Sequence, residues 1–148
     1  RELLSIFNEA GTIRRNPVDA SAHGIFPQNI GKINRIIDSD PNIDCVLYAY
    51  QLNFLERNIK RIGLSVEDAF SLLVEVWEGV KARVRAPVAL ALSRDSDELE
   101  AEEFRLILKQ RLLAAGVPAF DSVRAAGLVL LRMHQFRRAR ERVSGRVQ

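Results

Sequence analysis

Three apolar runs of strand length, separated by longer amphipathic segments, constrain the fold of this chain more than any other feature. They are Cys45–Tyr50, Pro87–Leu92 and Pro118–Phe120. An apolar run without alternation is typical of a strand buried on both faces of a parallel sheet. Strand–helix repeats with short connections form right-handed crossovers. The pattern therefore predicts an α/β domain with a mainly parallel sheet.

The segments between these runs carry helix signals. Pro27 suits a first helical turn, where its missing N–H costs nothing. Ser65, with Asp68 three residues later, is close to a capping box, and Asp121 or Ser122 can cap the last helix. Helical spacing predicts the buried stripes Ile30, Ile33 and Ile37; Phe70, Leu73, Val74, Trp77 and Val80; Phe104, Ile107, Leu108 and Leu112; and Val123, Ala126, Leu130 and Met133.

The first 26 residues are less regular. Glu2–Ala10, closed by Gly11, is predicted to be the end of a helix, and since the chain opens without Met we expect a fragment of a longer protein. Thr12–Val18 is predicted to be a short strand, placed at an edge because Pro17 lacks a backbone donor. Ser21–Phe26 is predicted to be a loop.

These elements predict a flavodoxin-like, three-layer α/β/α fold with a mainly parallel sheet of about four strands, its first strand missing. We expect residues 1–148 to form one partial domain. In a 2-1-3-4-5 sheet the first strand is central, so its loss exposes two strand edges. Either Thr12–Val18 pairs directly with Cys45–Tyr50, or two copies associate as a homodimer that completes the sheet.

Charge and composition exclude several classes of function. The net charge of +3 is concentrated in the basic helix end 132–148, which can bind nucleic acid or an acidic partner. A solvated helix end explains it better, because no aromatic residue interleaves the arginines after Phe136, so we do not expect nucleic acid. No apolar run reaches the ~18–20 residues that span a bilayer, so no membrane partner is expected. The lone Cys45 fits a reducing, cytoplasmic compartment, and the chain predicts no metal site.

No motif of a self-sufficient catalytic site is present. The sequence lacks G-x-S-x-G, the P-loop, G-x-G-x-x-G and H-E-x-x-H. The acidic cluster at 98–103 opens a helix, where the helix dipole explains it. The stretch 53–64 reads as a short amphipathic helix or an ordered loop. Its Arg57, Lys60 and Arg61 follow a strand on the ligand side of the sheet, where they either contact an anion or, as the spacing favours, form a solvated face.

The remaining candidate is the stretch between the predicted short strand and the Pro27 helix. A helix N-terminus carries unpaired N–H groups and a partial positive charge, so it can hold an anion. His23 is either a direct anion contact or, as is more common for a loop histidine, a polar surface residue. The predicted anion-facing loop consists of Asn16, Asp19, Ser21, Ala22, His23 and Gly24.

The order of several short segments resembles the NDP-forming acyl-CoA synthetases, relatives of succinyl-CoA synthetase that include ADP-forming acetate–CoA ligase. The segments are RNPVD at 15–19, DPNIDCVL at 40–47, APVALA at 86–91, LAAGVPAF at 113–120 and SVRAA at 122–126. The third and fourth stand where that family has its "KPV" and "aGIPvf" strand starts, and the last resembles its "peraara" helix start. Together they span nearly the whole chain.

The resemblance implies a reversible ligase system that interconverts acyl-CoA, ADP and phosphate with acid, CoA and ATP through a phosphohistidine. This chain would be its CoA-ligase, flavodoxin-like domain. Asn16 and Asp19 would shape a turn that faces the phosphohistidine of another domain, with the N–H groups of residues 21–24 as donors. The parent would use CoA, ATP or ADP, and Mg. This chain alone would hold no cofactor and catalyse nothing, and its partners would be other domains or subunits of the synthetase.

The chain departs from that family at three turns. Ala20 stands where a Gly or Gly-Asp is usual, Gln51–Asn53 replaces a common Thr-Pro, and Ser93–Ser96 replaces a Gly-rich turn. An alternative is therefore a regulatory or scaffolding module of the same fold without ligase chemistry, for example in an acyltransferase fusion. A response-regulator-like or flavin-binding protein ranks lower, because its acidic cluster and phosphate loop are missing.

Overall fold

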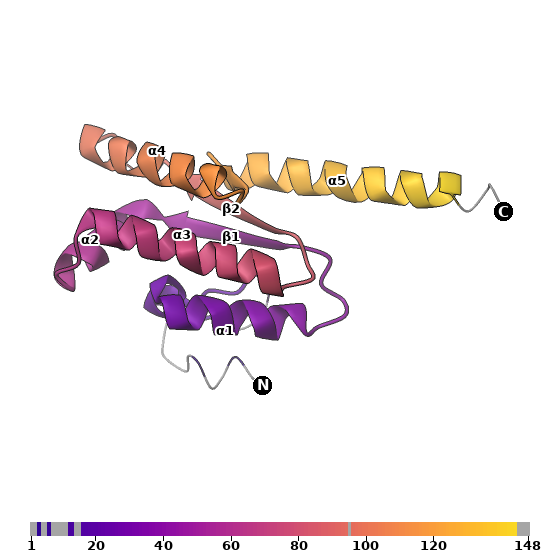
Figure 1. Cartoon of the computed structure of the whole chain (residues 1–148), viewed down its shortest axis with the longest axis horizontal. Coiled ribbons are helices and arrows are strands. Elements are labelled where there is room, and N and C mark those ends of the chain that lie inside the picture. Colours follow the sequence, from indigo (N-terminus) through magenta and orange to yellow (C-terminus); the bar gives the residue numbers. More distant parts are fainter. Residues whose placement is uncertain (1–2, 4–5, 7–11, 14–15, 95, 145–148) are drawn as a thin grey trace.

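A computed structural model describes residues 3, 6, 12–13, 16–94 and 96–144 (Figure 1). A parallel sheet flanked by helices confirms the predicted α/β class. In chain order the elements are the 3₁₀ helix η2 (Ser21–Ile25), α1 (Pro27–Asp38), β1 (Val46–Gln51), α2 (Leu52–Arg61), α3 (Val66–Arg83), β2 (Val88–Ser93), α4 (Leu99–Ala114), β3 (Ala119–Phe120) and α5 (Val123–Ser144).

The sheet that the described residues form has three parallel strands in the order β1-β2-β3, where the sequence predicted about four. Val46 lies opposite Val88, and Leu90 lies opposite Ala119. The predicted strand at 12–18 does not join the sheet. Ile13 instead bridges Asp19 in antiparallel fashion, so the described part of this segment folds back on itself. Except for residues 3 and 6, the predicted helix at 2–10 lies outside the described residues.

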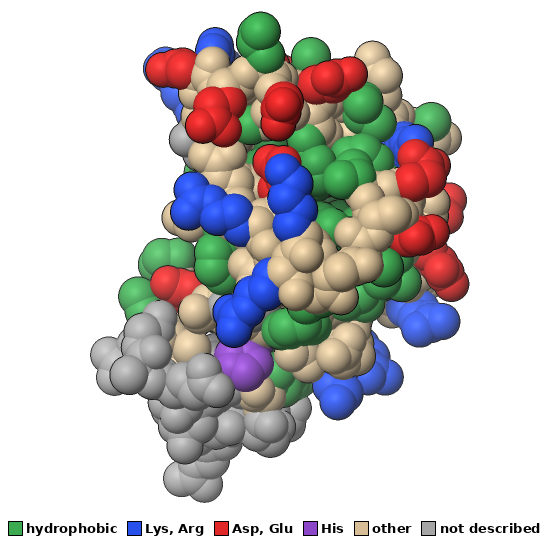
Figure 2. All heavy atoms as spheres, turned by 90° about the vertical axis from the view of Figure 1, so that its left-hand side faces the viewer, with side chains coloured by type: hydrophobic (Ala, Val, Ile, Leu, Met, Phe, Trp, Pro, Cys, Tyr) green, Lys and Arg blue, Asp and Glu red, His purple; other side chains and the backbone are tan. Residues whose placement is uncertain are grey.

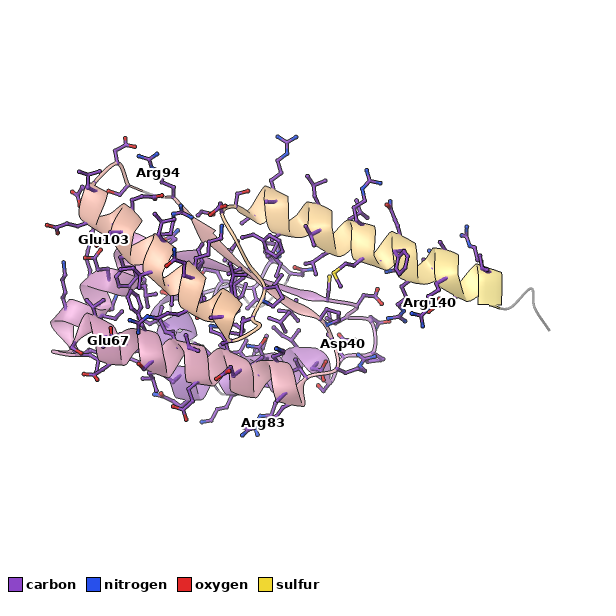
Figure 3. All side chains as sticks on the ribbon, turned by 45° about the horizontal axis from the view of Figure 1, so that its top comes forward. Asp40, Glu67, Arg83, Arg94, Glu103 and Arg140 are labelled. Carbon is purple, nitrogen blue, oxygen red and sulfur yellow. The ribbon has the colours of Figure 1, made fainter. Side chains whose placement is uncertain are left out.

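Helices lie on both faces of the sheet, which gives the three layers that the pattern predicted (Figures 1 and 3). On the face that we call the front, side chains of α1 to α4 pack with Tyr50, Leu90 and Leu92 in one hydrophobic core. On the back face, α5 crosses all three strands. The back-face side chains of β2, Ala89 and Ala91, are small and fully buried, which suits the close approach of a helix.

β1 is not buried on both faces as its apolar run predicted. Val46 and Tyr50 are buried at the front, but Cys45 and Ala49 are exposed. β1 is an edge strand, and within the described residues α5 is the only helix on the back face, where it lies mainly over β2. The back-face side of β1 is consequently open.

The projecting half of α5 also differs from the prediction. Of its predicted stripe only Ala126 is buried, and Met133 is 56% exposed. Figure 1 shows the reason: α5 continues beyond the amino ends of the strands, where no described element covers it. Figure 3 shows Arg140 on this projecting part, at the opposite end of the molecule from Arg94 and Glu103.

The helix starts follow the capping signals of the sequence. The Ser65 hydroxyl oxygen accepts a hydrogen bond from the Asp68 N–H at 3.1 Å, and the Asp68 carboxylate accepts one from that hydroxyl at 2.6 Å. Of the two candidates at the last helix, Ser122 caps it by accepting from the Ala125 N–H. Across the described part of the chain, none of the helices combines the length and apolarity that crossing a membrane requires.

The Asp38 carboxylate joins the end of α1 to the segment before β2. It accepts hydrogen bonds from the N–H of Arg85 at 3.0 Å and from the N–H of Ala86 at 2.7 Å. These two backbone bonds, first Arg85 and then Ala86, lower the pKa of Asp38 below its ordinary value of 3.8. The charged form of Asp38 therefore stabilises the folded chain.

Replacing Asp38 with asparagine is expected to remove part of the acid sensitivity of folding. A carboxyl whose pKa is lower in the folded state stabilises it fully above the unfolded pKa, and this contribution is lost as pH falls through the folded pKa. The difference in Tm between the wild type and Asp38→Asn, followed by circular dichroism, should be largest near neutral pH and shrink below the ordinary carboxyl pKa. A difference that is constant with pH would contradict this role.

Candidate functional site

The carboxyl ends of the strands lie at the left of Figure 1, and the candidate residues gather at this end of the molecule. α2 follows β1 without an intervening loop, and η2 packs on α1. Figure 2 looks onto this face and shows Lys and Arg side chains near its centre, next to a histidine, with Asp and Glu side chains above them. In open α/β sheets this edge is where ligands bind.

The predicted anion-facing loop is a closed turn followed by a 3₁₀ helix. Two backbone hydrogen bonds between Ile13 and Asp19, of 2.9 and 2.8 Å, close the turn. The Asp19 carboxylate accepts a further bond from the Ser21 N–H at 2.8 Å, and Ser21 has a positive φ of 46°. Residues 21–25 form η2 rather than an irregular loop, because this short-range bonding winds the chain into a helical turn. Asn16 lies exposed on the closed turn.

The bonding within the loop uses some of the donors that the sequence offered to an anion. The Ser21 N–H donates to Asp19 and the His23 N–H donates to the Ala20 carbonyl at 3.0 Å. Ala22 and Gly24 belong to η2, which lies between the turn and α1. Helix α1 begins at Pro27, as the proline predicted, and it has no side-chain cap. The loop therefore presents a structured surface rather than a row of four open N–H groups.

A long-range hydrogen bond fastens this loop to the sheet. The Tyr48 hydroxyl donates to the Gly24 carbonyl at 2.5 Å. Burial raises the pKa of Tyr48 well above its usual range, so the hydroxyl stays protonated and remains a donor. The contact leaves no space at Gly24, because a Cβ there would lie 2.8 Å from the Tyr48 Oη and 3.3 Å from the Ala20 Cβ. A Cβ at position 24 would therefore force Tyr48 or the loop to shift.

Substituting Gly24 with alanine should destabilise the chain by about 1–2 kcal/mol, because the new methyl group overlaps the Tyr48 hydroxyl. The measurement is the free energy of unfolding in urea. Tyr48→Phe removes the overlapping oxygen, so the double variant should lose less stability than the sum of the two single variants. Strict additivity of the two losses would show that the methyl group introduced at position 24 does not contact the Tyr48 hydroxyl.

The stretch at 53–64, for which the sequence allowed a helix or an ordered loop, is largely helical and belongs to α2. The buried side of α2 consists of Leu52, Leu55 and Ile59. Lys60 is occupied by an ion pair with Glu56 at 2.7 Å. Arg57 is exposed, and no ion pair to it occurs among the described residues.

A hollow of about 350 Å³ opens where β1 passes into α2, lined by Gln51, Asn53, Phe54 and Arg57. It joins a guanidinium, two amide side chains and an aromatic ring at the carboxyl edge of the sheet. Such a set can bind an anion, because guanidinium and amide groups donate hydrogen bonds to oxyanions. The spacing of the sequence favoured a solvated face for these cations. Only the fold shows that one of them, Arg57, borders a hollow.

Two acidic residues around the start of α4 have structural partners. Arg94 pairs with Asp97 at 3.2 Å, and Glu102 binds the Arg105 guanidinium through both carboxylate oxygens. Across the described residues, no three His, Cys, Asp or Glu side chains come together as a metal site. The functional interest of this end of the molecule therefore rests on the loop and the Arg57 hollow.

No protein-family model, curated protein or solved structure matches the chain. A function for it is therefore inferred from the arrangement of its own residues and from the order of its sequence segments.

Proposed function

We propose that this chain is the flavodoxin-like CoA-ligase domain of an NDP-forming acyl-CoA synthetase. In this role it presents the loop at 16–24 to a phosphohistidine carried by another domain or subunit and performs no chemistry by itself. The proposal rests on the five sequence segments that occur in the order of that family and on the position of the loop.

The hydrogen bond between Tyr48 and Gly24 is the observation that carries the proposal. It holds the loop against the first strand of the sheet, on the side where ligands of α/β domains bind. A surface that receives a group from another domain must keep its shape before that group arrives, because ordering it afterwards weakens binding. The closed Ile13–Asp19 turn and the Tyr48 anchor both supply such preorganisation.

Arg57 is the side chain that we propose contacts the anion. Two of the loop N–H groups already donate hydrogen bonds within the loop. Part of the positive charge that balances the anion must therefore come from a side chain. Among the three α2 cations considered from the sequence, Arg57 alone borders the hollow at the carboxyl edge. An arginine fork is well suited to a phosphoryl group, which it can bind through two parallel hydrogen bonds.

The assignment is tested by measuring how fast the full-length protein forms acyl-CoA from CoA, ATP and an added carboxylic acid. Arg57→Gln should lower kcat/KM by about tenfold to a hundredfold, the range for loss of a charged hydrogen bond of ~1.5–3 kcal/mol. Arg61→Gln is the matched control, because it removes the same charge from an exposed position on the same helix. Equal effects of the two substitutions, or none from either, would refute the role of Arg57.

A regulatory or scaffolding module of the same fold is the second candidate, and the open back face of β1 favours it. Exposed strand edges and uncovered sheet faces are suited to contacts with other chains. Full-length protein that folds and assembles but forms no acyl-CoA with any acid supplied would support this candidate over the ligase.

A further inference from the structure

Within the part of the chain that the structure describes, the outer side of β1 is an open strand edge. The Val46 N–H donates to the Pro87 carbonyl at 2.8 Å, so Val46 points its backbone groups toward β2. In a parallel ladder, successive residues direct these groups to opposite sides. The N–H and C=O groups of Leu47 and Ala49 therefore point away from β2, and none of the described residues pairs with them.

This edge lacks the features by which monomeric proteins protect an edge strand. Such strands usually carry a charge, a proline or a bulge. β1 reads VLYAYQ, without a charged residue or proline, and it pairs in regular register over all six residues. The back face beside it is also open, since Ala49 is exposed there. Edge and face together form one uncovered surface.

The ends of β1 carry opposite charges, which favours an antiparallel neighbour of the same sequence. Asp44 precedes the strand and is exposed, while the α2 helix that follows the strand carries the exposed Arg57 and Arg61. An antiparallel copy of β1 places the acidic end of one strand beside the basic end of the other. A parallel copy places like charges together, which costs free energy.

We propose that two copies of this chain associate through β1, antiparallel about a two-fold axis, and form one continuous six-stranded sheet. The outward groups then pair Leu47 of one copy with Ala49 of the other, and the two-fold axis passes between the two copies of Tyr48. The interface is self-complementary, as a two-fold dimer requires.

Sedimentation velocity of the full chain over two decades of concentration tests the proposal with Ala49→Pro and Ala49→Val. The wild type should show a concentration-dependent dimer. Ala49→Pro removes one outward N–H from each copy and so two ladder bonds, which should raise the dimer Kd by about thirtyfold. Ala49→Val keeps the N–H and should remain dimeric. A wild type that is monomeric throughout, or equal Kd values for the two variants, would overturn the proposal.

A second variant and a second measurement cover the case in which proline disturbs folding. Ala49→Lys keeps the N–H but places a charge at the interface, and it should likewise favour the monomer. Hydrogen exchange of the Leu47 and Ala49 amides should be slow in the dimer and become fast on dilution. Slow exchange in a monomer would show instead that another segment of the chain covers this edge.

Discussion

Replacing Trp77 with alanine is expected to lower the free energy of unfolding by about 3–5 kcal/mol, the largest effect of any substitution considered for this chain. Trp77 is 1% exposed and belongs to the front core. Its ring packs edge-on against Tyr48, with centroids 4.9 Å apart, and against Tyr50 at 6.2 Å. Removing it leaves a cavity between α3 and β1 and takes the packing support from the tyrosine that anchors the loop.

Unfolding in urea followed by circular dichroism measures this loss, with Tyr50→Phe as the matched comparison. The Trp77 indole N–H donates to the Tyr50 hydroxyl at 3.0 Å inside the core. Tyr50→Phe keeps the ring but leaves that N–H without its partner, which should cost about 1–3 kcal/mol. A loss below about 1 kcal/mol for Trp77→Ala would contradict a core centred on this residue.

Replacing Arg105 with alanine is expected to cost about 2 kcal/mol, because this side chain holds α4 to the turn that begins α5. Its guanidinium binds the Glu102 carboxylate at 2.6 and 2.9 Å and the Asp121 carboxylate at 2.5 Å. Arg105 is 8% exposed, but the Asp121 side chain is 60% exposed and can rehydrate. The cost should therefore stay below the ~3–5 kcal/mol seen when a fully buried pair is broken.

Lys109→Ala is the control for Arg105, since its ammonium also binds Asp121, at 2.6 Å. Lys109 is more exposed than Arg105, so its loss should cost less than about 1 kcal/mol. The pKa of Asp121 is lowered by Lys109 and Arg105, and that of Glu102 by Arg105. The advantage of the wild type over Arg105→Ala should thus be full above the ordinary carboxyl pKa and fall in acid. Equal losses for both variants would contradict a special role for Arg105.

Local signals in the sequence predicted the order of the elements well. The apolar runs at 45–50, 87–92 and 118–120 mark the three strands, and the Ser65 capping box marks the start of α3. Each of these features depends on residues close together in the chain, where backbone preference and hydrophobic spacing decide the structure. The burial of Trp77 follows from the same spacing.

Features that depend on distant residues could not be predicted. An apolar strand such as β1 has the same sequence whether it lies in the centre or at the edge of a sheet, so its open back face became evident only from the fold. The apolar stripe of α5 continues beyond the end of the sheet. Helical spacing in the sequence does not indicate where the supporting strands stop, so the exposure of this part could not be predicted. The Tyr48–Gly24 bond and the Arg105 cluster join residues 24 and 16 positions apart.

The loop at 16–24 was predicted to face an anion on the basis of a local motif, and the structure gives the conformation of this loop. Asp19 does bind within its turn, but the N–H groups of Ser21 and His23 are engaged inside the loop. The Arg57 hollow was not singled out in advance, because a basic amphipathic helix has the same spacing whether or not it borders a site. A tyrosine within an apolar strand was the one signal that could have indicated an anchoring contact.

Phosphorylation of the full-length protein tests the central claim most directly. We expect incubation with γ-labelled ATP and Mg²⁺ to give a phosphoprotein that is labile in acid and stable in alkali, as phosphohistidine is. The label should be lost when CoA and the cognate acid are added together, and this loss should be slower in the Arg57→Gln variant than in Arg61→Gln. The proposed role would be contradicted by a full-length protein that takes up no such label. It would also be contradicted if the label were lost at the same rate in Arg57→Gln and Arg61→Gln.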